Sequence, residues 1–102
     1  MQIFSCVENK TLKILLSGEL DEYTATSTRE KLDYIFMNDQ YNTIVIDMSG
    51  LTFMDSTGIG VLIGRYKKAK TVNKQIYITN PNKHIEKIFQ MSGIYEIMPK
   101  IS

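Results

Sequence analysis

This sequence of 102 residues lacks tryptophan, holds only two prolines and has a single cysteine, Cys6. One cysteine cannot close an internal disulfide and is too few for a metal site built from thiolates. We expect Cys6 to be a small buried apolar side chain on a strand. Because no low-complexity tract or proline-rich linker divides the chain, residues 1–102 are predicted to form a single domain.

Neither sign of charge predominates, since the formal net charge is +1 and 23% of the residues are charged. Nucleic-acid-binding proteins usually carry a strong basic excess, so that class is not favoured. No apolar run approaches the roughly 18 residues of a membrane-spanning helix, and the first residues lack the pattern of a secretory signal. We therefore expect a cytoplasmic protein without nucleic-acid or membrane partners, and we take a monomer as the default.

The hydrophobic pattern predicts strands and helices that alternate along the whole chain. Strands are expected at 3–7, 12–16, 44–46 and 75–78, the first two joined as a hairpin, with 94–98 as a possible edge strand. Helices are expected at about 24–38, 57–70 and 82–92. The predicted fold class is α/β, with a mixed sheet of four to five strands packed with three to four helices.

Several finer features follow from residue type and spacing. Ser27 and Glu30 fit a capping box at the first helix, and strand 44–46 is typical of a central strand covered on both faces. The basic run 65–70 is expected to be a solvated helix face. The buried stripe of the same helix is predicted to consist of Ile59, Leu62, Ile63, Tyr66 and Ala69.

Two loops draw attention because open sheets of this kind act at the carboxyl ends of their strands. One loop covers residues 18–23 and includes Asp21, and the other covers residues 48–57. In the second loop, Asp55, Ser56 and Thr57 are all residue types that cap helices. A phosphate on the exposed serine there would add about −1.5 to −2 charges. By spacing alone, such a run is more often a simple capped helix.

Two glycines follow this cap, and both are expected to expose backbone in the first turn of the helix. Free N–H groups at such a turn favour anions. Gly58, Gly60 and Gly64 also resemble a dinucleotide-binding run. However, about ten residues separate the first glycine from its strand, and the next strand ends without the expected acid. Nucleotide binding therefore stays a weaker alternative.

Enzyme chemistry finds little support. The only histidine, His84, is expected on a solvent-facing turn, and the Gly-x-Ser-x-Gly pattern of serine hydrolases is absent. Asp21, Asp47 and Asp55 could gather around a divalent cation, but carboxylates scattered over loops are more often caps and turn formers. We therefore predict no catalytic residue, no metal site and no cofactor.

Four blocks in order, residues 18–21 (GELD), 53–60 (FMDSTGIG), 64–67 (GRYK) and 91–94 (MSGI), carry a family resemblance. The chain resembles STAS domains, and among them the bacterial anti-sigma factor antagonists. The block at 64–67 is more similar to the sporulation members than to the general stress-response members. The resemblance spans nearly the whole chain and implies the STAS fold.

The resemblance implies a partner-switching cycle. An unphosphorylated antagonist binds a nucleotide-bound anti-sigma factor and frees the sigma factor. That anti-sigma factor is a serine kinase, which would phosphorylate Ser56 and so weaken binding, and a PPM-type serine phosphatase would reverse the step. The contact surface implied for the partner consists of Asp21, Asp55, Ser56, Thr57, Gly58 and Gly60. A STAS module of another signalling system, such as stress-response partner switching, stays open as an alternative.

Overall fold

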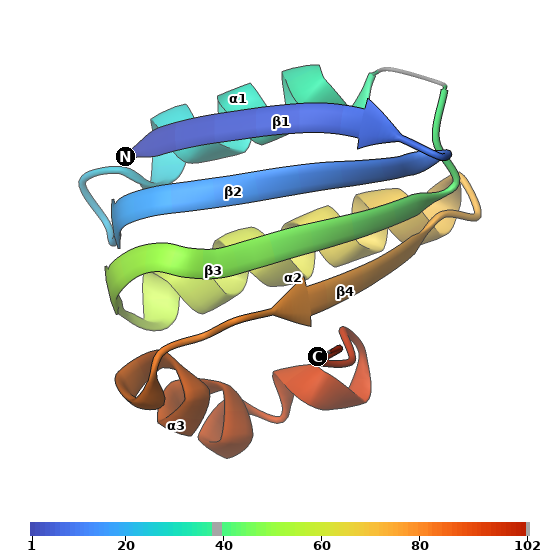
Figure 1. The fold of residues 1–102 in the computed structure, drawn as a ribbon. Coiled ribbons are helices and arrows are strands. Elements are labelled where there is room, and N and C mark those ends of the chain that lie inside the picture. Colours follow the sequence, from blue (N-terminus) through green and yellow to red (C-terminus); the bar gives the residue numbers. More distant parts are fainter. Residues whose placement is uncertain (38–39, 102) are drawn as a thin grey trace.

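The computed structural model describes residues 1–37 and 40–101. Figure 1 shows the elements in chain order. They are β1 (Gln2–Glu8), β2 (Thr11–Leu20), α1 (Ala25–Phe36), β3 (Thr43–Met54), α2 (Ser56–Thr71), β4 (Gln75–Thr79), α3 (Lys83–Ser92) and the short 3-10 helix η1 (Ile94–Glu96).

The four strands form one mixed sheet in the order β1-β2-β3-β4. β1 pairs antiparallel with β2, while β2–β3 and β3–β4 are parallel pairs. The hairpin turns at Asn9 and Lys10, whose φ angles of 52° and 62° are both positive. Such a two-residue turn matches the twist of its flanking strands. The α/β class with a mixed sheet backed by helices is confirmed.

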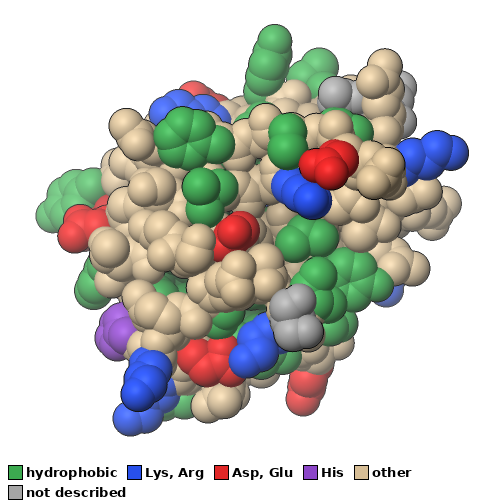
Figure 2. All heavy atoms as spheres, viewed as in Figure 1, with side chains coloured by type: hydrophobic (Ala, Val, Ile, Leu, Met, Phe, Trp, Pro, Cys, Tyr) green, Lys and Arg blue, Asp and Glu red, His purple; other side chains and the backbone are tan. Residues whose placement is uncertain are grey.

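Helices α1 and α2 lie behind the sheet and cover one of its faces (Figure 1). Ile44 and Ile46 are buried beneath them, but Val45 between them is only half-buried. The expectation that β3 is covered on both faces is therefore wrong. Figure 2 views the other face, where hydrophobic side chains lie in separate patches among a few charged ones. Cys6 is exposed on β1 rather than buried.

β3 is much longer than the predicted strand 44–46, so the expected loop at 48–57 shrinks to the junction at Asp55. Met48, Leu51 and Met54 are all buried. Their spacing of three breaks the period of two expected for a strand, because the β2–β3 pairing is irregular beside Ser17 and Gly18. Because of this irregularity, the alternating hydrophobic pattern did not reveal the second half of the strand.

The predicted edge strand at 94–98 is instead the 3-10 helix η1 and its continuation. Ile94 and Met98 are both buried, and a spacing of four suits a helical turn better than a strand. Gly93 begins this turn with φ 74°. The chain then returns to the sheet, where Lys100 forms a single parallel bridge with Ile78.

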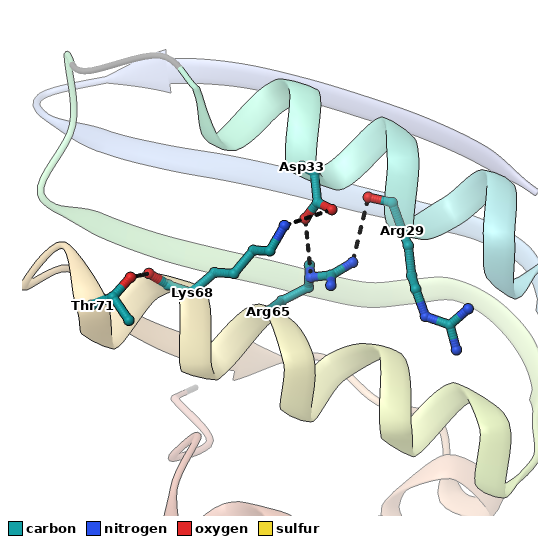
Figure 3. Close-up of polar contacts among 5 residues, drawn as sticks. All are labelled: Arg29, Asp33, Arg65, Lys68 and Thr71. Carbon is teal, nitrogen blue, oxygen red and sulfur yellow. Dashed lines mark hydrogen bonds and ion pairs between the residues drawn. The ribbon is translucent and has the colours of Figure 1, made fainter.

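Helices α1 and α2 are joined by a partly buried charge cluster (Figure 3). Arg65 is only 6% exposed, so the expectation that the whole basic run faces water is wrong at this position. Its Nε lies 3.3 Å from Oδ1 of Asp33, and its Nη1 donates to the carbonyl of Arg29 at 3.4 Å. The Asp33 contact is an ion pair without hydrogen-bond alignment. Burial lowers the pKa of Arg65, and Asp33 opposes that effect.

The buried stripe of α2 is therefore rotated from the predicted one. Leu62 and Ala69 are buried as expected, whereas Ile59, Ile63 and Tyr66 are only half-buried. The residues that this helix buries are Gly58, Val61, Leu62, Arg65 and Ala69. Two of them, the glycine and the arginine, are of types not expected in a buried stripe. Neither residue counts as apolar in a periodicity analysis, which explains the error.

Candidate functional site

The loops after β2 and β3 lie side by side at the carboxyl ends of these two neighbouring strands. Leu20 and Met54 are paired residues at the ends of these neighbouring parallel strands. The backbone N–H of Asp55 donates to the carbonyl of Leu20 at 3.4 Å. Asp21 directly follows β2 and Asp55 directly follows β3, so the structure brings these two predicted site residues close together.

Asp55 is the N-cap of α2. Its backbone is extended, with φ −115° and ψ −172°, and its Oδ1 accepts hydrogen bonds from the N–H groups of Thr57 at 2.9 Å and Gly58 at 3.2 Å. Two of the N–H groups that we expected to be free for an anion are thus already bound to a carboxylate. The start of the helix is fixed, and the local charge there is negative.

Ser56 is the first residue of α2 and is exposed. In the part of the chain that the structure describes, its hydroxyl makes no hydrogen bond, whereas the neighbouring Thr57 is half-buried. The Asp55 cap holds the backbone on one side, and the Ile59 N–H donates to the Asp55 carbonyl at 3.3 Å. The arrangement presents one free hydroxyl group on a rigid support.

The two glycines of the segment differ from each other. Gly60 is exposed, and an added Cβ there would meet nothing within 4 Å, as expected for open backbone. Gly58 is buried, and an added Cβ would lie 2.6 Å from Cγ of Met54 and 2.8 Å from the carbonyl oxygen of Leu20. The expectation of exposed backbone is wrong for Gly58, whose lack of a side chain lets α2 pack against the end of β2.

Asp21 shapes the neighbouring loop. Its Oδ1 accepts from the N–H groups of Tyr23 at 2.9 Å and Thr24 at 3.1 Å. The Thr24 hydroxyl in turn donates to the carbonyl of Glu19 at 2.9 Å. Thr24 is the N-cap residue of α1, so the capping box predicted at Ser27 and Glu30 does not form. The loop holds Tyr23 outward, with 87% of the side chain exposed.

An apolar groove of about 420 Å³ borders Ser56, between α2 and α3. Ile59, Ile88 and Met91 line it, and the Met91 side chain is 82% exposed. Near this end of the sheet, the exposed Phe53 stacks on His84 with ring centroids 6.4 Å apart. This groove has no signature in the sequence, because its two walls lie about thirty residues apart and each resembles the ordinary apolar face of a helix.

The three aspartates do not form one cluster. Asp21 and Asp55 bind their own loops, whereas the Asp47 carboxylate accepts from the N–H of Ser49 at 2.8 Å farther back along β3. The described residues contain no group of three His, Cys, Asp or Glu side chains placed to hold a metal ion. Within the same residues, no helix is long and apolar enough to span a membrane.

Comparison with known protein families gives one match that covers most of the chain. The model of the family described as the STAS domain matches residues 6–102. A protein of Paenibacillus polymyxa named anti-sigma F factor antagonist is 36% identical over 88 residues, which are 86% of this chain and 75% of the relative. A protein of Staphylococcus aureus named anti-sigma-B factor antagonist is 28% identical over 98 residues, covering 96% of this chain and 90% of the relative.

Among solved structures, the anti-sigma factor antagonist SpoIIAA is similar in two forms. Its unphosphorylated form superposes with a TM-score of 0.72 at 26% identity, covering 99% of this chain and 88% of that one. Its phosphorylated form, described as that of a Bacillus cell fate determinant, gives a TM-score of 0.72 at 29% identity and covers 99% and 92% of the two chains. SpoIIAA has thus been observed both with and without phosphate.

Proposed function

This chain belongs to the STAS domain family, and from that premise we propose that it is an anti-sigma factor antagonist controlled by phosphorylation at Ser56. The observation that carries the proposal is the free Ser56 hydroxyl on a capped helix start, at the junction of two loops. The named antagonists among its relatives support the regulatory role. In this role the protein binds another protein and catalyses no reaction itself.

In the proposed cycle, the unphosphorylated chain binds a nucleotide-bound anti-sigma factor and releases the sigma factor. The anti-sigma factor acts as a serine kinase and transfers the γ-phosphoryl group of ATP to the Ser56 oxygen, leaving ADP and a proton. A PPM-type serine phosphatase then hydrolyses the phosphoserine. Because the kinase step uses ATP, the cycle takes place in the cytoplasm.

Phosphorylation would change the charge at the centre of the site. A phosphate adds about −1.5 to −2 charges, and it would stand beside the Asp55 carboxylate, which already occupies the N–H groups of Thr57 and Gly58. An unpaired charge in a docked interface costs roughly 2–5 kcal/mol. That range corresponds to a loss of about 30-fold to several thousand-fold in affinity, which is enough to exchange one partner for another.

Each part of the site has its own task in this proposal. Asp21 holds its loop beside the acceptor, and Asp55 and Thr57 form the capped start of α2. Gly60 offers open backbone for close approach by the partner. Gly58 is buried and lets the start of α2 pack against Leu20. The exposed apolar side chains around the site would contribute contact area.

A stress-response role is the second candidate. The relative from Staphylococcus aureus is named for sigma-B, and the match covers 90% of that protein. Its identity of 28% is lower than the 36% of the relative named for sigma-F. The Ser56 site serves both roles equally, so the choice of sigma factor depends on which anti-sigma factor binds.

The test is intact-mass spectrometry after incubation with ATP and the anti-sigma F factor of Paenibacillus polymyxa, whose antagonist is the relative noted above. We expect one phosphate on the native chain and none on Ser56→Ala. Ser92→Ala is the matched control, because Ser92 lines the same groove. That variant should be phosphorylated as the native chain is.

Phosphate on Ser56→Ala at the native level would refute the assignment of the acceptor. If the native chain gains no phosphate while the kinase modifies its own antagonist, the sigma-F role is wrong. The same assay with the anti-sigma-B factor of Staphylococcus aureus then decides the second candidate.

A further inference from the structure

The two edges of the sheet differ. At the outer edge of β4, the Ile78 N–H donates to the carbonyl of Pro99 at 3.0 Å, and the Ile101 N–H donates to the carbonyl of Ile78 at 2.8 Å. The C-terminal segment thus covers that edge. In the described part of the chain, no strand pairs with the outer edge of β1 (Figure 1). An unpaired edge offers its N–H and carbonyl groups to another strand.

β1 also lacks the features that usually protect such an edge. It has seven residues, contains no lysine or proline, and carries a single charge at its last residue, Glu8. Its pairing with β2 is continuous from Gln2 to Glu8, without a bulge. Charged side chains, proline and bulges are the common means by which proteins prevent edge pairing. The edge of β1 therefore remains competent to pair.

Apolar side chains flank this edge on both faces. On the face without helices, Phe4 is 55% exposed and lines a groove of about 530 Å³. On the face toward α1, Val7 lines a second groove together with Tyr34 and Met37, both of which are 76% exposed. A partner strand at this edge would remove these side chains from water on both faces.

We propose that β1 pairs with β1 of a second copy of this chain, antiparallel about a two-fold axis through Ser5. In this register each residue of the strand has a partner: Ser5 with Ser5, Phe4 with Cys6, Ile3 with Val7, and Gln2 with Glu8. Apolar side chains meet on both faces, the single carboxylate meets an amide, and no like charges stand opposite each other. The edge is thus complementary to itself, which favours a second copy over a different protein.

The product is a dimer with one continuous sheet of twice four strands. Asp21, Asp55 and Ser56 all lie outside β1, so pairing at this edge uses none of the residues of the Ser56 site. The inference goes beyond the proposed function and does not depend on it. It replaces the monomer that we took as the default from the sequence.

The first test is sedimentation equilibrium of the full chain at concentrations up to about 1 mM. We expect the mass to rise from 11.7 kDa toward twice that value. Phe4→Lys should remain monomeric, since lysine on an edge strand opposes pairing. Phe53→Lys is the matched control, because Phe53 is also an exposed phenylalanine and should dimerise like the native chain. A mass that stays at 11.7 kDa throughout overturns the proposal and leaves the edge to a strand of another protein.

A second test fixes the register without disturbing the edge. With Cys6→Ser as background, Ser5→Cys places a thiol on the two-fold axis, whereas Ile3→Cys places two thiols about 13 Å apart along the strands. A thiol cross-linker that spans no more than about 8 Å should join Ser5→Cys chains and not Ile3→Cys chains. Equal yields from both variants, or no yield from Ser5→Cys, would overturn the proposed pairing.

Discussion

Asp33 on α1 and Arg65 on α2 face each other across the helix pair, with the carboxylate Oδ1 3.3 Å from the guanidinium Nε (Figure 3). Lys68 reaches the other carboxylate oxygen at 2.8 Å. The Lys68 side chain is 54% exposed, whereas that of Arg65 is 7% exposed. The longer contact is thus the buried one, and it joins the helix that follows the Asp21 loop to the helix that begins with Ser56.

The two cations should therefore contribute unequally to stability. Arg65→Ala should lower the free energy of unfolding by about 2 kcal/mol. The loss is smaller than the roughly 3–5 kcal/mol of a fully buried pair, because Asp33 keeps Lys68 and is partly solvated. Lys68→Ala should cost less than about 1 kcal/mol, as exposed pairs do. Urea denaturation of both variants measures the difference, and equal losses would contradict this account of the cluster.

The glycines of the Ser56 segment offer a second matched pair. Gly58→Ala should destabilise by about 1–3 kcal/mol, because the new methyl group would press against Met54 and the Leu20 backbone. Gly60→Ala should be neutral or stabilise by up to about 1 kcal/mol, since the helix is open there. Thermal unfolding of both variants provides the measurement. A harmless Gly58→Ala would show that α2 does not pack closely on β2.

The Asp55 side chain contributes its hydrogen bonds to stability and its charge to the site. Asp55→Ala removes the cap of α2 and should cost about 1 kcal/mol. Asp55→Asn keeps an oxygen that can accept from Thr57 and Gly58, so we expect little loss of stability. Denaturant titrations of the two variants separate the cap from the charge. If Asn were as harmful as Ala, the cap would depend on the charge rather than on the hydrogen bonds.

Glu86 gives the stability a pH dependence. Its Oε2 accepts from the Tyr95 hydroxyl at 2.5 Å, and its Oε1 lies 3.0 Å from Nζ of Lys100. The hydrogen bond from Tyr95, followed by that from Lys100, lowers the pKa of Glu86 below its ordinary 4.5. The stabilisation is therefore present above about pH 4.5 and lost as the pH falls through the folded-state pKa.

Removal of the tyrosine hydroxyl should reveal this effect. Tyr95→Phe should be less stable than the native chain at pH 7, by less than about 1 kcal/mol, and this difference should shrink toward pH 3. Burial together with Glu86 also raises the pKa of Tyr95 itself, so the native chain gains stability that is lost only at strongly alkaline pH. Denaturation curves across the pH range test this, and a difference that is constant with pH would contradict it.

The sequence predicted the order of the elements up to α3 and the placement of Asp21 and Asp55 near the ends of β2 and β3, because both follow from local patterns. The junction at Ser56 is encoded within a few residues by cap and glycine types. The predictions were wrong where contacts between distant parts of the chain override the local hydrophobic pattern. The irregular pairing beside Gly18 disturbed the period of β3, and the buried Arg65 does not count as an apolar residue.

Features that depend on distant residues were not predictable. The groove beside Ser56 needs Ile59 and Ile88 to meet, and neither residue carries a signal of the other. The exposure of Cys6 likewise depends on β1 being an edge strand that helices leave open on one face. Residue type predicts average burial, whereas strand order decides it at a particular position.

The close approach at Gly58 has a consequence for how a signal at Ser56 would be read. With the helix start fixed to the sheet by Gly58 and by the Asp55 cap, a group added to Ser56 has no hinge to act on. In the proposed cycle, the phosphorylated and unphosphorylated states would share the backbone at the start of α2 and differ in the charge and size of one surface group. Binding to the partner would then change as soon as the phosphate is added or removed, because no refolding step would separate the chemical step from recognition.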